Sequence, residues 1–412
     1  MTDSREFNII VYGATGFVGE LIVKHLAATA PEDARIALAG RSRNRVDALK
    51  ARLGGRALSF PTIQADSAQP DTLAAIAERT RVVLTTVGPY AEHGIPLVQA
   101  CAEAGTHYAD LTGEVLFVRE SIDRFDELAR NNGARIVHSC GFDSVPSDLA
   151  TLLAADRARA DGAGELTDST LHASMKGGFS GGTIASMKGQ IDTLHRDPAA
   201  RKIVTDPYAL SPDRAAEPDG GKSRFESPKV ELDREIDCWV APFVMSSFNE
   251  PVVRRSNALD GWAYGRSLRY REVMVTGKGR KGQALAYAVA AALGALLTGL
   301  SKAPTRLLLD RILPKPGEGP SEKDRAAGRF MMSLRAHTTS GTVYVSRVGA
   351  HKDPGYDGTA VMIGQAALAL AFDADRLPQR AGVLTPATGI GHALADRLAA
   401  QGFTVDVAPA TS

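Results

Sequence analysis

Three glycines, Gly13, Gly16 and Gly19, recur at three-residue intervals between an apolar run and a segment with helical spacing. Glycine in such a turn lets the backbone approach a phosphate closely, and the N-terminus of the following helix attracts negative charge. The spacing G-x-x-G-x-x-G differs from the dinucleotide fingerprint G-x-G-x-x-G, so the neighbouring elements must support this interpretation. The lysine of a P-loop is missing, which argues against a nucleoside triphosphatase.

The elements around the glycines form one βαβ unit. Residues 7–12, FNIIVY, are the continuous apolar run of a parallel strand buried on both faces. Apolar residues then recur at helical spacing through Leu26, and a second short strand is expected at 35–40. The unit therefore predicts a nucleotide-binding loop rather than a structural turn.

The end of the second predicted strand distinguishes between nicotinamide cofactors. A carboxylate there accepts hydrogen bonds from ribose hydroxyls, whereas an arginine pairs with a 2′-phosphate. This chain has Arg41 and Ser42 at that point and no carboxylate, so we expect NADP(H). A solvated basic turn is the alternative.

Composition and charge exclude several classes of function. The 412 residues suffice for two domains, and 48 Lys and Arg against 47 Asp and Glu give no sign of a nucleic-acid partner. Cys101, Cys140 and Cys238 contain no C-x-x-C pair, so we expect free thiols in a reducing compartment and no metal site. The N-terminal residues lack a secretory pattern, and a cytoplasmic location is expected.

Further apolar runs alternate with helical patterns, as in a doubly wound parallel sheet. The expected strands are 81–88 and 134–141, and the expected helices are 70–78, 95–104 and 114–131. The fold class is therefore α/β, a Rossmann-type doubly wound parallel sheet with an inserted α+β second domain. The expected domains are an NADP-binding Rossmann domain at 1–152, a substrate and catalytic domain at 153–355, and a segment at 356–412 that returns to the first domain.

The second domain has its own features. Half-buried strands are expected at 267–276 and 342–350, and residues 197–230 suggest a long excursion or lid. Residues 282–300 carry no charge and have basic flanks. Their many alanines favour a helix buried in the protein or in a homodimer over one that spans a bilayer. A peripheral membrane contact through 278–306 lies between these alternatives.

Several motifs together resemble those of a known family. They are YGATGFVG, LAGRS, the stretch 85–114, SCGFDSVPSDLA at 139–150 and GFSGGTIAS at 178–186, with further matches downstream. The chain resembles the saccharopine dehydrogenase-like oxidoreductases, most closely their trans-acting enoyl reductase branch in actinobacteria. The resemblance implies NADPH-dependent reduction of a carbon–carbon double bond in an acyl chain carried by a polyketide synthase that lacks a working enoyl reductase.

The resemblance also implies roles for individual residues. The pyrophosphate loop corresponds to Gly13, Ala14, Thr15, Gly16, Phe17, Val18 and Gly19, the adenosine end to Arg41 and Ser42, and the nicotinamide ribose loop to Val87, Gly88, Pro89 and Tyr90. Candidate catalytic residues are Tyr90, Asp143 and Ser144, and candidate substrate residues are Lys176, Ser180, Gly181, Gly182 and Thr183. Tyr108, Asp110 and Glu114 are expected to hold a loop and to cap the next helix.

Three functions remain open from the sequence. The first is a trans-acting enoyl reductase for polyketide or lipid acyl chains, with a carrier protein of the synthase as its partner. The second is a saccharopine-type oxidoreductase acting at a carbon–nitrogen bond of an amino acid. The third is a non-catalytic NADP(H)-binding partner of a lipid assembly.

Overall fold

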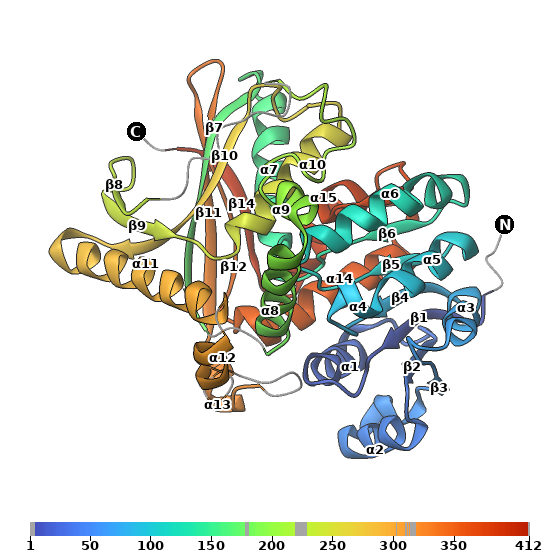
Figure 1. Ribbon diagram of the computed structural model, residues 1–412. Coiled ribbons are helices and arrows are strands. Elements are labelled where there is room, and N and C mark those ends of the chain that lie inside the picture. The colour runs from blue at the N-terminus through green and yellow to red at the C-terminus, as the bar shows by residue number, and fades with distance from the viewer. Residues whose placement is uncertain are drawn as a thin grey trace.

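The computed structural model describes residues 5–177, 181–218, 229–301, 303–309, 311, 313 and 319–410. Within these residues, the chain forms two seven-stranded sheets that stand beside each other with helices between them (Figure 1). One sheet is parallel and the other is mixed, which confirms the expected α/β class with a second, α+β domain.

The first sheet belongs to the Rossmann-type domain. Its order is β13 (Gly382–Leu384), β6 (Arg135–Val137), β5 (His107–Ala109), β4 (Thr80–Thr85), β1 (Phe7–Tyr12), β2 (Ile36–Gly40) and β3 (Thr62–Gln64). All six pairings between neighbours are parallel. All six residues of β1 are buried, as its uninterrupted apolar sequence predicts for a central parallel strand.

Helices cover both faces of this sheet. They are α1 (Phe17–Thr29), α2 (Arg43–Leu53), α3 (Pro70–Glu78), α4 (Tyr90–His93), α5 (Ile95–Ala104), α6 (Val115–Asn131), α14 (Thr359–Phe372), α15 (Pro386–Gly389) and α16 (His392–Ala400). The apolar faces of α3, α5 and α6 form one core with Ile10 and Val83, whereas α1 and α14 form another with Ile9 and Val11. Successive strand residues point to opposite faces, so each strand feeds both cores.

The second sheet carries the other domain. Its order is β14 (Thr404–Pro409), β12 (Val343–Ala350), β11 (Arg329–Thr338), β7 (Leu166–Lys176), β10 (Arg269–Gly277), β9 (Cys238–Pro242) and β8 (Glu231–Asp233). Only β7 and β10 pair in parallel. The sequence patterns predicted β10 and β12 but not the central strand β7 or its neighbour β11.

The remaining helices are α7 (Val145–Ala160), α8 (Gly181–Arg196), α9 (Pro198–Val204), α10 (Ser246–Leu259), α11 (Gly279–Ser301), α12 (Ala303–Leu309) and α13 (Glu322–Ala326). Of these, α7, α10 and α11 pack against the second sheet, whereas α9 contacts α6 of the first domain. One apolar core extends from β1 through α14 and α7 to β11 and β12. Because this core is continuous, the two domains pack against each other at the carboxyl ends of the strands of the first sheet.

The C-terminal segment contributes to both domains. Its strand β13 extends the first sheet beside β6, and α14 is buried from Thr359 to Ala371 between the two sheets. Its last strand, β14, instead pairs antiparallel with β12 in the second sheet. Only part of residues 356–412 therefore returns to the Rossmann domain.

The apolar helix α11 is not buried, so the sequence-based expectation for residues 282–300 is wrong for the single chain. The most apolar 18-residue stretch of this 23-residue helix has a mean hydropathy of 1.8, yet only 11% of that stretch is buried. It contacts β9, β10, α8 and α12 through a narrow strip that includes Gly282 and Ala286. Figure 1 shows it along the outer edge of the second domain.

Candidate active site

The glycine loop between β1 and α1 has the shape that a pyrophosphate requires. Gly13 has φ +90°, and a Cβ there would lie 2.6 Å from Thr86 Oγ1; a Cβ on Gly19 would lie 2.2 Å from the Gly13 carbonyl oxygen. The Thr86 hydroxyl donates a hydrogen bond of 3.1 Å to that carbonyl and so fixes the loop against the end of β4. Gly16 precedes α1 and lines a cavity.

The first turn of α1 faces the same cavity. Phe17 and Val18 line it, and the N–H groups in the first turn of a helix have no acceptor within that helix. The Phe17 ring is held by an edge contact with Tyr356, at a centroid distance of 5.1 Å, and by the Arg325 guanidinium, 5.2 Å from the ring centroid. The loop at residues 13–19 therefore presents helix N–H groups toward the cavity, an arrangement compatible with a bound pyrophosphate.

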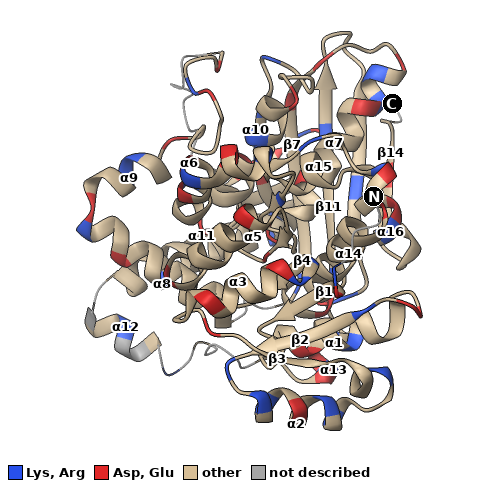
Figure 2. Cartoon of the chain, turned by 90° about the vertical axis from the view of Figure 1, so that its right-hand side faces the viewer, with Lys and Arg blue, Asp and Glu red and all other residues tan. Residues whose placement is uncertain are grey.

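The adenosine end is basic. Arg41 follows β2 directly and is exposed, and Ser42 caps α2 by accepting a hydrogen bond of 3.4 Å from the Arg45 amide. Arg43 and Arg45, in the first turn of α2, are also exposed, and Figure 2 shows the basic residues along this helix. These side chains fit a 2′-phosphate, which is the group that separates NADPH from NADH.

We expect Arg41→Ala to weaken NADPH binding by about ten- to a hundredfold, the loss of a charge-assisted contact of about 1.5 to 3 kcal/mol. NADH binding should change little, because NADH has no 2′-phosphate. Both cofactors are titrated by fluorescence or calorimetry. Arg52→Ala, at the other end of α2, is the matched control. Equal affinity of the wild type for NADPH and NADH would contradict the prediction.

The loop after β4 lies where the nicotinamide ribose is expected. Gly88, Pro89 and Tyr90 line the cavity, while Val87 packs against the neighbouring core. The Glu114 carboxylate accepts hydrogen bonds from the amides of Tyr90, at 3.0 Å, and Ala91, at 2.8 Å. Ser186 of α8 donates to the same carboxylate at 2.6 Å. Glu114 thus caps α4 and not α6, and it ties the nicotinamide loop to the second domain.

The Tyr90 hydroxyl is engaged within the protein. It donates to the Thr85 carbonyl at 3.2 Å and accepts from the Leu111 amide at 3.1 Å. Its single hydrogen is therefore directed at a backbone carbonyl, and this candidate catalytic residue has no hydrogen left to donate to a substrate. The geometry makes Tyr90 a positioning residue for two loops that line the cavity.

We expect Tyr90→Phe to lower the free energy of unfolding by about 1 to 3 kcal/mol, because a buried carbonyl and a buried amide lose their partner. The turnover rate should fall by about tenfold as the two loops shift, with NADPH affinity nearly intact. Tyr108→Phe is the control, because the Tyr108 hydroxyl donates to Asp110 and the residue does not line the cavity. The two variants losing turnover equally would contradict the positioning role.

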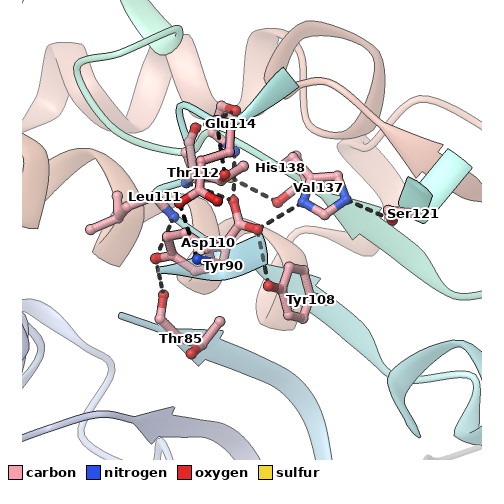
Figure 3. A network of polar contacts seen from close by, with 12 residues as sticks. Thr85, Tyr90, Tyr108, Asp110, Leu111, Thr112, Glu114, Ser121, Val137 and His138 are labelled. Carbon is pink, nitrogen blue, oxygen red and sulfur yellow. Dashed lines mark hydrogen bonds and ion pairs between the residues drawn. The ribbon is translucent and has the colours of Figure 1, made fainter. Parts of the chain in front are cut away.

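A buried polar network supports this wall of the site (Figure 3). The fully buried Asp110 carboxylate accepts from the Tyr108 hydroxyl at 2.9 Å and from the amides of Thr112 and Ser139 at 3.1 and 2.8 Å. His138 Nδ1 lies 2.7 Å from it, and the other ring nitrogen lies 2.8 Å from the Ser121 hydroxyl. The network fixes the segment from Asp110 to Glu114.

Two cavities meet at the carboxyl ends of the first sheet. The larger has a volume of about 560 Å³ and runs from the glycine loop past Tyr90 to α8 and α10. The smaller has a volume of about 310 Å³ and is walled mainly by apolar side chains. These are Phe142, Met175, Phe243, Met245, Met274, Val275, Leu285 and Val289. A nucleotide and an apolar chain could occupy adjoining spaces here.

Asp143 lines both cavities. Among the described residues, it is the one acidic or basic side chain in either wall, and none of them donates a hydrogen bond to its carboxyl group. Burial raises the pKa of Asp143 from 3.8 to about 7, because a carboxylate away from water is less stable than the neutral acid. The side chain can therefore hold or give a proton near neutral pH.

The other candidate catalytic and substrate residues differ in whether they line a cavity. Ser144 is fully buried, and its hydroxyl donates to Asn249 Oδ1 at 3.2 Å, so it does not reach either cavity. Gly181, Gly182 and Thr183 line the larger cavity at the start of α8. Lys176 is exposed at the end of β7 and is in neither wall, and Ser180 lies outside the described residues.

Several wall residues were not found from the sequence. Met245, Phe248 and Tyr356 lie outside the quoted motifs, Gln190 follows the last of them by four residues, and none carries a local pattern that differs from ordinary core residues. The most direct signal is the helical spacing of Met187, Ile191 and Leu194, which line the cavity from α8. Its Gln190 side chain donates to the Gly113 carbonyl at 3.0 Å.

Comparison with known proteins agrees with this geometry. Residues 9–137 match the family described as Saccharopine dehydrogenase NADP binding domain, so the first domain is an NADP-binding domain. A putative trans-acting enoyl reductase of Mycobacterium tuberculosis is 49% identical over 414 residues, covering 97% of each chain. A trans-acting enoyl reductase of Mycobacterium bovis is 47% identical over 409 residues, again with 97% of each chain covered.

Solved structures show the same fold at low sequence identity. Saccharopine dehydrogenase of Saccharomyces cerevisiae superposes with a TM-score of 0.55 at 12% identity, covering 98% of this chain and 100% of that one. Homospermidine synthase of Legionella pneumophila gives 0.50 at 9% identity, covering 98% and 92%. These matches support the fold alone. The relatives at 47 to 49% identity show that the chain belongs to the saccharopine dehydrogenase-like oxidoreductases and, within them, to the family of trans-acting enoyl reductases.

Proposed function

We propose that the protein uses NADPH to reduce the carbon–carbon double bond of an α,β-unsaturated acyl thioester carried by a polyketide synthase. The observation that carries the proposal is the pair of adjoining cavities, one beginning at the NADP-binding loop and one lined by apolar side chains, with Asp143 at their junction. The names of the relatives, trans-acting enoyl reductases, support the reaction.

The composition of the walls disfavours an amino-acid substrate. A saccharopine-type reaction would need arginine or lysine side chains to bind several carboxylates. Among the described residues, neither cavity wall contains a Lys or Arg. An apolar chain is compatible with these walls, because its transfer from water is favourable and leaves no charge unpaired.

In the proposed reaction, the cofactor supplies the hydride, and side chains and backbone of the protein supply the proton and a hydrogen bond. NADPH supplies a hydride to the β-carbon when it is bound in this site. Asp143, protonated up to about pH 7, gives a proton to the α-carbon, and the carboxylate takes up a proton from water afterwards. The first turn of α8, at Gly182, can donate a hydrogen bond to the thioester carbonyl, where negative charge develops.

The test follows NADPH absorbance together with the mass of the acyl chain, using an enoyl chain on a carrier protein. A product heavier by two hydrogens, formed as NADPH is consumed, is the expected result. Saccharopine and a matched saturated acyl chain serve as controls. Turnover of saccharopine but not of the enoyl chain would favour the second function, and NADPH binding without turnover of either would favour the non-catalytic one.

A further inference from the structure

The outer face of α11 is an extended apolar surface on the second domain. Within the described residues, three of the five exposed large apolar side chains belong to this helix: Leu285 at 50%, Tyr287 at 57% and Leu297 at 40%. Ala284, Ala288, Ala291, Ala292 and Ala295 are exposed beside them. A patch of this kind on a soluble domain marks an interaction site.

The sheet topology shows that α11 cannot cross a bilayer in this fold. β10 precedes the helix and β11 follows it, and both strands are hydrogen-bonded to β7. A helix spanning the membrane would place β10 and β11 on opposite sides of the bilayer and separate them from β7. In this fold, a helix with the length and hydropathy of α11 can therefore contact a bilayer only by lying along its surface.

The charges at the start of α11 point to an anionic surface. Arg280 and Lys281 are exposed in its first turn, and no acidic residue accompanies them there. Cations are unfavourable at this end of a helix, because the helix dipole places partial positive charge there. Anionic headgroups would relieve that repulsion while the apolar face enters the acyl boundary.

The same helix forms a wall of both cavities. Leu285 and Val289 line the smaller cavity, and Leu293 and Leu297 line the larger one. These four residues recur every four positions and so form one stripe along the helix. Leu285 and Leu297 belong both to the exposed set and to a cavity wall, so both cavities reach the outside of the domain at α11.

We propose that α11 docks in the plane of an anionic lipid bilayer and opens the acyl cavities toward the lipid. The basic first turn lies at the headgroups, and the exposed alanines, Tyr287 and the flanking leucines lie in the acyl boundary. This role of the opening rests on the proposed function: the apolar end of the carrier-bound acyl chain then passes from the lipid to the cavity without crossing water.

The test measures co-flotation of the full chain with vesicles of phosphatidylcholine, with and without phosphatidylglycerol. The wild type is expected to float with the phosphatidylglycerol vesicles, less with phosphatidylcholine alone and less at high salt. Tyr287→Glu combined with Ala291→Glu should reduce the bound fraction by about tenfold or more, because both positions are exposed and carry charge into the apolar boundary. Leu58→Glu, an equally exposed apolar residue on the first domain, is the matched control.

An activity assay distinguishes the membrane proposal from the proposed reaction. The Tyr287→Glu, Ala291→Glu variant should reduce a water-soluble enoyl thioester as the wild type does, since neither residue lines a cavity. Failure of the wild type to float, or flotation of the variant equal to it, would overturn the membrane proposal whatever the activity. A two-chain particle in light scattering that the variant abolishes, without vesicle binding, would also overturn it and assign the face to a second copy.

Discussion

Replacing Asp143 by Asn is expected to lower kcat for an enoyl thioester by about a hundredfold or more, the usual contribution of a positioned general acid. The amide has nearly the same size and cannot give a proton to the α-carbon. NADPH affinity should stay within about twofold, because the glycine loop and Arg41 bind the cofactor at a distance from this side chain. Stopped-flow reduction and a separate cofactor titration measure the two quantities.

The pH dependence of kcat gives a second readout for Asp143. Burial raises its pKa to about 7, so the carboxyl group is protonated below that pH and ionised above it. An acid must be protonated to act, so kcat of the wild type should be constant at low pH and fall as pH rises through about 7. The residual activity of Asp143→Asn should lack this step.

Ser144→Ala is the matched control for this experiment. Ser144 is adjacent in sequence but buried away from both cavities, and its hydroxyl donates only to Asn249 among the described residues. Its loss should change kcat by less than about tenfold and leave the pH profile in place. Equal losses in the two variants, or an unchanged pH step in Asp143→Asn, would remove Asp143 as the proton donor.

Replacing Asp110 by Ala is expected to lower the free energy of unfolding by about 3 to 5 kcal/mol, because several buried groups lose one acceptor, at a cost of about 1 to 3 kcal/mol for each unsatisfied group. The substitution leaves the Tyr108 hydroxyl, two backbone amides and His138 without their common acceptor (Figure 3). None of these groups can turn to water, because the carboxylate is fully buried at the centre of the network. Urea denaturation followed by circular dichroism measures the loss.

Asp123→Ala tests whether the effect comes from burial or from any lost carboxylate. Asp123 pairs with Arg119 on α6, and the Asp123 side chain is half exposed. Water can replace the lost carboxylate, and Arg119 keeps its hydrogen bonds to the carbonyls of Ala209 and Ser211, so the loss should be below about 1 kcal/mol. A similar loss in both variants would contradict the structural role given to the Asp110 network.

The local sequence was sufficient to predict the NADP-binding domain. A Cβ on Gly19 would meet the backbone of Gly13, and Gly13 has a positive φ and faces the side chains of Thr86 and Val87, so both positions favour glycine. The buried strand before them and the arginine after β2 are equally local features. For this reason the α/β class and the NADP-binding domain could be predicted from short stretches of sequence.

The part of the site that we propose binds the acyl chain could not be predicted in this way, because it is formed by contacts between segments that lie far apart in the sequence. Asp143 was identified from its motif, but the surroundings that raise its pKa to about 7 and set it at the junction of two cavities come from α8, β9, α10 and α11. Tyr90 showed the opposite outcome, because the bonds to Thr85 and Leu111 that occupy its hydroxyl cannot be seen in a linear motif. Burial and hydrogen-bond partners are properties of the packed chain.

The helix at 279–301 shows most clearly which properties follow from the sequence and which follow from the tertiary structure. Its sequence by itself determined that it is a long apolar helix with basic residues at its start, since both follow from composition and spacing. Alanine-rich helices pack closely or lie exposed equally well, so composition did not determine which faces are covered. Only the tertiary structure decided that, because the width of the second sheet and the pairing of β10 and β11 with β7 leave one strip of α11 in contact and the rest exposed.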